Sequence, residues 1–206
     1  MMIIFHLFYD LNHFKFINIQ MKKDIFWYMQ PKIIITLFLI SVGMNLCIAH
    51  GEKVRWQKFS KRLIKLVLIA GSISLITSFV FPGRWIYFGI LHNVSVSSVL
   101  ALAFLKRPKL SLILGLIIVI PSIFFNYKYP FFVLTKKPVD HVALFPWFGC
   151  VLMGIFLYSK GIHNIKIPDY KFKNVFSFLG RYSLEIYLLH QAILFPLVYL
   201  IRRISH

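Results

Sequence analysis

Residues 63–81 read LIKLVLIAGSISLITSFVF, and this stretch decides the class of fold. Such a run, with a single charged residue, is long enough for a helix to cross the hydrocarbon core of a bilayer, which takes roughly twenty residues. Two further blocks have the same character: IIITLFLISVGMNLCIA at 33–49 and LSLILGLIIVIPSIFF at 110–125. Several blocks of this length in one chain predict a polytopic bundle of transmembrane helices.

The composition of the 206 residues agrees with a membrane protein, because 59% are hydrophobic and 15% are charged, against about a quarter charged in soluble domains. The net charge is +18. In a soluble protein this excess indicates nucleic acid, but here Lys and Arg mostly occupy short gaps between apolar blocks, as in loops that face an anionic leaflet. We therefore expect a lipid bilayer and no nucleic acid as partner. Cys47 and Cys150 lie inside apolar blocks, where we expect them to serve packing.

The apolar windows predict an all-α fold of seven spans that form one domain over residues 1–206. The predicted spans are residues 1–18, 30–49, 63–81, 86–105, 110–126, 143–159 and 183–201. Lys and Arg are more numerous in the loops after the second, fourth and sixth spans, so the positive-inside rule places residues 50–62 in the cytoplasm and the C-terminus outside. The first span lacks the basic residue that normally precedes such a helix, so we expect the first helix to be truncated.

The first span also carries unusual polar residues. Its opening, MMIIFHLFYDLNHF, places His6, Asp10 and His13 at spacings that stack all three on one face of a helix. Ionisable groups inside a membrane indicate function by default. A carboxylate one turn from an imidazole fixes the tautomer of the ring and raises its basicity, which a general base requires. His6 with Asp10 is therefore the first catalytic candidate.

Further polar residues lie within the other predicted spans or at their outer ends, and they converge on the outer half of the bundle interior if these helices are neighbours. They are His92, Asp140, His141, His190 and Gln191. A lone membrane histidine such as His92 more often forms an interhelical hydrogen bond than a catalytic site, whereas for His190 the two interpretations are balanced. His6, Asp10 and His13 offer metal donors but not the tight His-x-x-x-His pair, so no metal is expected.

Four stretches together resemble a known family. They are MIIFHLFYDLNHF, FGILHNVSVS, DHVALFPWFG and LGRYSLEIYLLHQAIL. In this order, over nearly the whole chain, they are similar to bacterial membrane proteins related to the catalytic domain of heparan-alpha-glucosaminide N-acetyltransferase. The wider acyltransferase-3 membrane family is similar at both ends of the chain. The motif positions of these proteins match Asp10, His92, Asp140, Pro146, Trp147, Arg181 and His190, and the first-helix histidine matches His6.

The resemblance implies an enzyme of the bacterial inner membrane that moves an acetyl group from cytoplasmic acetyl-CoA to an acceptor on the outer side, a sugar amine or hydroxyl of an envelope saccharide. A homodimer is compatible with it. In this interpretation His6, steadied by Asp10, is the base or takes the acetyl group, and His190 or His92 donates to the oxyanion. The phosphates of acetyl-CoA are expected at Lys58, Lys61, Arg62 and Arg107. The acceptor is expected at Asp140, His141, Trp147 and Gln191.

The sequence departs from these relatives at its start. They carry a basic residue, an acidic residue and an Arg-Gly pair before the first apolar run, and the animal enzyme has its catalytic histidine in a loop after the first helix, so His13 is a second candidate. The alternative function is a transporter or proton-relay protein, which predicts pH-dependent flux and no binding of CoA. Against it, the sequence shows no paired halves of the kind that transporters have. A third interpretation is a chain that inserts in the membrane without catalysing a reaction.

Overall fold

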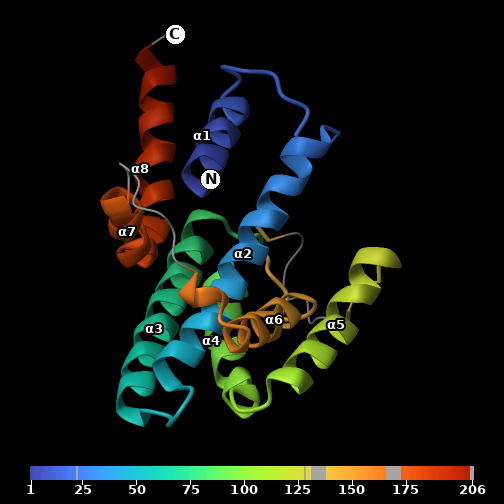
Figure 1. Cartoon of the computed structure of the whole chain (residues 1–206). Helices are drawn as coiled ribbons and strands as arrows, with labels where there is room; N and C mark the ends of the chain where they lie inside the picture. Colours follow the sequence, from blue (N-terminus) through green and yellow to red (C-terminus); the bar gives the residue numbers. More distant parts are fainter. Residues whose placement is uncertain (22, 128, 131–137, 166–172, 205–206) are drawn as a thin grey trace. The chain divides into compact units, whose positions relative to one another are not determined.

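A computed structural model of the chain describes residues 1–21, 23–127, 129–130, 138–165 and 173–204. Within these ranges all regular elements are helical, as predicted (Figure 1). In chain order they are α1 (Met2–His13), α2 (Ile25–His50), α3 (Trp56–Val80), α4 (Ile90–Ala101), η1 (Leu102–Phe104), α5 (Pro108–Phe124), α6 (Trp147–Ser159), η2 (Ile162–Asn164), α7 (Lys173–Arg181) and α8 (Ser183–Ile204). Each predicted span coincides with one α-helix, and α7 has no counterpart among the predictions.

Two of these helices are long and apolar enough to cross a membrane by themselves: α2, with 26 residues, and α3, with 25. The stretch Ile90–Phe104, α5 and α6 are shorter apolar helices. At 1.5 Å of rise per residue, the 13 residues of α6 extend about 20 Å, which is less than the roughly 30 Å of a bilayer core. Helix length therefore supports two crossings and does not establish the predicted seven.

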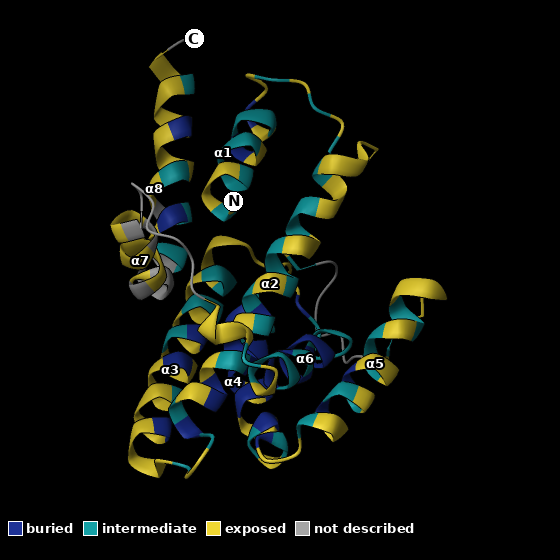
Figure 2. Cartoon of the chain, viewed as in Figure 1, coloured by how far each residue is buried: buried dark blue, intermediate teal, exposed yellow. Residues whose placement is uncertain are grey.

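The surface of α3 is typical of a helix in contact with lipid. Only Phe59, Leu66 and Ala70 are buried among its 25 residues, and Leu68 and Phe79 are 65% and 77% exposed (Figure 2). From residue 66 to the end of α3 the helix has no charged residue and is still largely uncovered, and such a surface has no stable place in water. The buried positions gather instead on α4 and α6, which lie in the interior.

The described helices form two compact units, and each is described by itself. The first comprises Met1–Ile34 and Lys166–His206, and so contains α1, the start of α2, α7 and α8. The second comprises Ile35–Ile165 and contains the remainder of α2 and the elements from α3 to η2. The division within α2 falls one turn after Pro31, which has no backbone N–H to donate. Whether residues 1–206 act as one domain stays a prediction.

In the first unit, aromatic rings surround α1. The ring of Phe8 lies 5.1 Å from Trp27 at the start of α2, measured between centroids. At the other end of α1, the ring of Phe14 lies 5.2 Å from Phe195 of α8. Such pairs add about 1 kcal/mol each beyond the area they bury. They hold the polar face of α1 in register with α8.

In the second unit, small residues let α2 and α6 approach closely. A Cβ atom on Gly154 would collide with the backbone of Ile40, and one on Gly43 would collide with the backbone of Val151. Close backbone contact through small residues is how apolar helices associate in lipid, where no hydrophobic force drives them together. Cys47 of α2 and Cys150 of α6 are buried thiols, which confirms their predicted role in packing.

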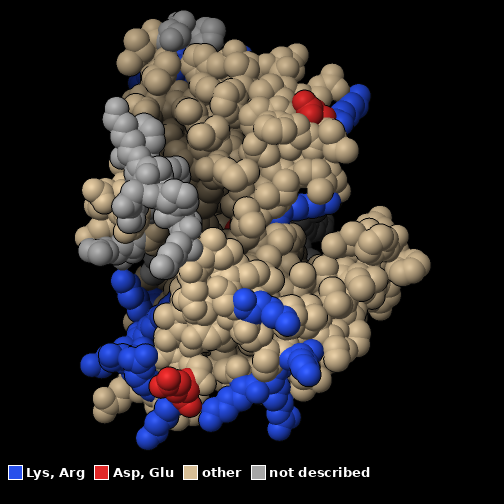
Figure 3. All heavy atoms as spheres, viewed as in Figure 1, with Lys and Arg blue, Asp and Glu red and all other residues tan. Residues whose placement is uncertain are grey.

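The connections of the second unit alternate between two ends. The turn from α2 to α3 and the link from α4 to α5 lie at one end, where Leu46, Phe59 and Ser98 meet. At the other end, the N–H of Val142 donates to the carbonyl of Phe88, so the segment before α6 lies beside the segment before α4. Figure 3 shows Lys and Arg crowded at the end where α2 turns into α3. The basic loops predicted after the second and fourth spans thus share one end of the unit.

Candidate functional site

The first unit brings the beginning of the chain against its last helix. The ring of His6 on α1 lies 4.7 Å from the ring of His190 on α8, between centroids. One turn along, the amide of Gln191 donates to both carboxylate oxygens of Asp10, at 3.1 and 3.2 Å. His13 also faces α8. The prediction that three polar residues share one face of the first helix is therefore confirmed, and that face contacts α8.

Asp10 is the most deeply placed residue of α1, with no exposed surface. Its hydrogen-bond partner is Gln191. We predicted a pairing with His6 on the same helix, but no hydrogen bond joins Asp10 to His6 in the described part of the chain. A primary amide on the facing helix presents two donors to the two carboxylate oxygens, which an imidazole one turn away cannot match.

His190 is 9% exposed, and its hydrogen bonds define its tautomer. Its Nδ1 lies 2.6 Å from the carbonyl oxygen of Tyr187, which can only accept, so Nδ1 carries the hydrogen. Its Nε2 is buried and has no hydrogen-bond partner among the described residues. The neutral ring therefore offers an acceptor at Nε2, whereas the predicted role of donating to an oxyanion requires a hydrogen on that atom.

In the second unit, His92 has partners for both ring nitrogens. The N–H of Gly89 donates to Nδ1 at 3.2 Å, and Nε2 lies 3.2 Å from Oγ of Ser74. Because the Ser74 hydroxyl already donates to the carbonyl of Ile86 at 2.6 Å, Nε2 is the donor of this pair. These bonds cap the start of α4 and tie it to α3. They match the structural interpretation of a lone membrane histidine.

Asn93, next to His92, was not singled out in the sequence. It is fully buried, and its amide donates to the carbonyls of Val142 at 3.3 Å and Ala143 at 2.7 Å. Its oxygen accepts from Ser97 at 2.9 Å. Asn93 thus fastens the segment before α6 to α4. The available signal was the polar run HNVSVSS at 92–98, inside the apolar window 86–105.

The segment before α6 carries residues predicted to bind the acceptor. The Asp140 carboxylate lies beside Gly89 at the start of α4, where an added Cβ would come within 3.1 Å of its Oδ2. Burial raises the pKa of Asp140, and a hydrogen bond from the His141 backbone partly opposes this effect. The His141 ring lies 5.5 Å from that of Tyr87, and Trp147 is the first residue of α6. The hydroxyl of Tyr87 is buried without a partner among the described residues.

The candidate residues therefore divide into two groups. His6, Asp10, His190 and Gln191 lie in the first unit, and His92, Asp140, His141 and Trp147 lie in the second. Their convergence on one site stays a prediction. The side chain of Arg181, a further motif position, lies outside the described residues. Among the residues that the structure describes, no group of three or more His, Cys, Asp or Glu is placed to hold a metal ion.

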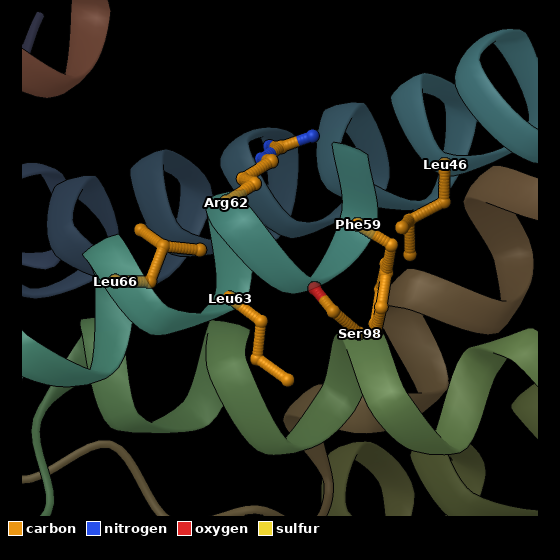
Figure 4. Close-up of a pocket in the computed structure, with 6 residues that line it drawn as sticks. All are labelled: Leu46, Phe59, Arg62, Leu63, Leu66 and Ser98. Atoms are coloured by element: carbon orange, nitrogen blue, oxygen red, sulfur yellow. The ribbon is translucent and has the colours of Figure 1, made fainter. Parts of the chain in front are cut away.

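The residues predicted to bind acetyl-CoA lie at the basic end of the second unit. Lys58, Lys61 and Arg62 are exposed on the first turns of α3, and Arg107 is exposed directly before α5. Arg62 also borders a small hollow, where it extends from α3 on the side away from α4 (Figure 4). The other lining residues are Leu46, Phe59, Leu63, Leu66 and Ser98. Several cations at one end, two of them guanidinium groups, fit the phosphates of a nucleotide.

Lipid-type helix surfaces, together with a buried cluster of imidazole, carboxylate and amide groups, define a membrane protein with polar chemistry in its interior. The particular family follows from a comparison of sequences. The chain matches the family model for heparan-alpha-glucosaminide N-acetyltransferase, catalytic, over residues 1–192, and therefore belongs to that family. The family indicates a membrane transferase with an acetyltransferase-like function, and its members generally use acetyl-CoA as donor. No curated protein and no solved structure matches the chain.

Proposed function

We propose that the chain is an acetyltransferase of the bacterial inner membrane, which moves an acetyl group from cytoplasmic acetyl-CoA to an amine or hydroxyl of an envelope saccharide on the outer side. The family match carries the proposal, because it covers residues 1–192 and so includes both α1 and the His190–Gln191 pair. The proposal includes seven crossings, by α1 to α6 and α8, in a single domain, with the basic end in the cytoplasm. It is compatible with a homodimer.

At the cytoplasmic end, the proposal assigns the phosphates of acetyl-CoA to Lys58, Lys61, Arg62 and Arg107. What supports this is their charge and their position at the starts of α3 and α5, at a common end of the second unit. An arginine binds a phosphate with two parallel hydrogen bonds, while a lysine acts as a mobile point charge. The apolar helices around this end suit the uncharged arm of the molecule. Asp140, His141 and Trp147 are proposed to bind the acceptor.

Acetyl transfer needs a group that takes a proton from the nucleophile as it attacks the thioester carbon. An imidazole of the α1–α8 contact, His6 or His190, is proposed for this role. The bond between the nucleophile and the acetyl carbon forms, the C–S bond breaks, and the proton passes to the leaving sulfur, so that CoA departs as a thiol. Burial of the cluster keeps water away from the thioester and so limits hydrolysis.

Binding of acetyl-CoA to the purified protein in detergent, measured by calorimetry, tests the proposal. We expect saturable binding by the wild type and by His6→Ala, because His6 is not among the proposed phosphate contacts. The double variant Lys58→Glu/Lys61→Glu should bind at least about tenfold more weakly, since the loss of one charged contact costs about 1.5 kcal/mol or more.

The matched control is Lys15→Glu/Lys23→Glu, which makes the same change of charge outside the second unit and should bind as the wild type does. If the folded wild type does not bind acetyl-CoA, the proposal is wrong. Proton flux in proteoliposomes then becomes the measurement that tests the proton-relay function.

A further inference from the structure

We propose that His190 is the base of the acetyl transfer and that it accepts the proton of the acceptor at Nε2 while its Nδ1 hydrogen stays on the carbonyl of Tyr187. The inference rests on the proposed function and decides between the two histidines of the α1–α8 contact. The first-helix position of His6 favours the other choice, so the two assignments make different predictions.

The hydrogen bond to Tyr187 fixes the chemistry of the ring. A backbone carbonyl has no hydrogen to give, so at 2.6 Å the bond requires the hydrogen to be on Nδ1 of His190. The same bond orients the ring, because Tyr187 is three residues earlier on α8. In a neutral imidazole with one nitrogen protonated, the other holds a lone pair. A base needs that lone pair in a fixed direction.

The lone pair of His190 is buried and lacks a partner. Neither Nε2 of His190 nor Oε1 of Gln191 has a hydrogen-bond partner among the described residues, although both atoms are buried. The orientation of the Gln191 amide is set by Asp10, because the N–H side of the amide donates to both carboxylate oxygens. Two adjacent buried acceptors are costly, at about 1–3 kcal/mol each, unless a ligand with donor hydrogens satisfies them. An acceptor amine or hydroxyl carries such hydrogens.

His6 lacks a hydrogen bond of this kind in the described part of the chain, so its tautomer is not fixed. Its ring is half-buried beside His190, with an angle of 57° between the ring planes. His6 therefore lies against the ring of His190 and is assigned as a positioning residue. Its removal should loosen the ring of His190 without removing the proton acceptor.

The proposed step balances without a further reactant. The N–H or O–H of the acceptor donates to Nε2 of His190, and its nitrogen or oxygen attacks the thioester carbon while the proton moves to Nε2. The ring is then an imidazolium, next in sequence to Gln191, whose amide is bonded to the carboxylate of Asp10. As the C–S bond breaks, the imidazolium gives the proton to the sulfur. The neutral tautomer with its hydrogen on Nδ1 is restored.

The variant that tests this is His190→Asn, because the amide nitrogen of Asn takes the place of Nδ1 and keeps a donor for Tyr187, while nothing takes the place of Nε2. The readout is acetyl transfer from acetyl-CoA to D-glucosamine by the full chain in detergent. We expect kcat to fall by about a hundredfold or more, with little change in KM. His6→Asn should lose about tenfold or less, and His163→Asn, on an exposed histidine far along the chain, should match the wild type.

Two readouts separate a base from a structural group. In His190→Gly, added imidazole should restore transfer in proportion to its concentration, which loss of packing does not allow. In ¹⁵N NMR of histidine-labelled wild type, the signal that His190→Asn removes should show hydrogen on Nδ1 and none on Nε2. Hydrogen on Nε2 overturns the inference.

The outcomes also distinguish the inference from the function. If the wild type transfers acetyl groups and His190→Asn does so equally well, the inference is wrong and the proposed function stands. If the wild type transfers nothing to D-glucosamine, the proposed function fails for this acceptor. The NMR result then decides whether His190 presents the acceptor atom on which the inference depends.

Discussion

The two units each place an imidazole next to an amide, but with different hydrogen bonding. In the second unit, every polar side-chain atom of His92 and Asn93 has a hydrogen-bond partner. In the first unit, Nε2 of His190 and Oε1 of Gln191 are buried with no partner in the described part of the chain. The residue types are similar, an imidazole next to an amide on an apolar helix, so residue type does not explain the difference. Polar groups that complete each other's hydrogen bonds fasten helices together. A buried acceptor without a hydrogen bond carries a desolvation cost, and a ligand that donates a hydrogen bond to it compensates that cost.

The largest effect should come from breaking the packing of the second unit. Gly154→Leu places a side chain where the backbone of Ile40 lies, and a backbone cannot yield as a flexible side chain does. We expect the variant to give no monodisperse protein in detergent, as measured by size-exclusion chromatography. The control is Gly71→Leu on α3, where a Cβ meets nothing within 4 Å. If both variants fold equally well, the α2–α6 contact is not what holds this unit together.

A smaller effect should sharpen the contrast between the two polar clusters. Asn93→Leu leaves two carbonyls and the Ser97 hydroxyl without their partner, so we expect a loss of stability on the order of 2 kcal/mol and a clearly lower melting temperature. Asn45→Leu, at an exposed position of α2, should melt like the wild type. His190→Asn should also keep the melting temperature while losing activity. A large drop in the melting temperature of His190→Asn contradicts the idea that His92 and Asn93 hold helices together while His190 and Gln191 bind a ligand.

The smallest effect concerns the segment before α6. Because burial raises the pKa of Asp140 above its ordinary value, the folded protein holds this proton more tightly than the unfolded chain does. The resulting stability is present at low pH and is lost as the pH rises through the raised pKa. Asp140→Asn removes the titration, so its melting temperature should rise relative to the wild type between pH 4 and pH 8. An offset that does not change with pH shows that Asp140 makes no titration-linked contribution.

The long helices could be predicted because their apolar blocks are continuous, and the shorter ones only in part. The windows 86–105 and 143–159 each begin four residues before their helices, α4 and α6. The extra residues are apolar, but distant side chains hold them in a non-helical path: Thr77 bonds Ile86, and Asn93 bonds Ala143. A hydropathy window contains no information on such contacts. For α7, nine residues of mixed polarity gave no apolar block at all.

The candidate site shows the same limit. The spacing of His6 and Asp10 on one helical face followed from the sequence, because helical periodicity is local. The partner of Asp10 did not follow, since Gln191 is 181 residues away along the chain. The tautomer of His190 depends on the carbonyl of Tyr187, a backbone group that every residue carries. Roles that depend on which atom carries a hydrogen can therefore be read only from a structure.

The separation between Asp10 and Gln191 also has a consequence for biosynthesis. At about 5–20 residues per second, the ribosome needs roughly 10 to 40 s to make the 181 residues between them. During this time α1 carries a carboxylate that has no partner from α8, and such a group is costly in the hydrocarbon core. In the proposed arrangement, in which α1 crosses the bilayer, α1 therefore has to wait in a polar site, within the insertion machinery or at the headgroups, until α8 emerges. In that arrangement, α8 completes the insertion of α1.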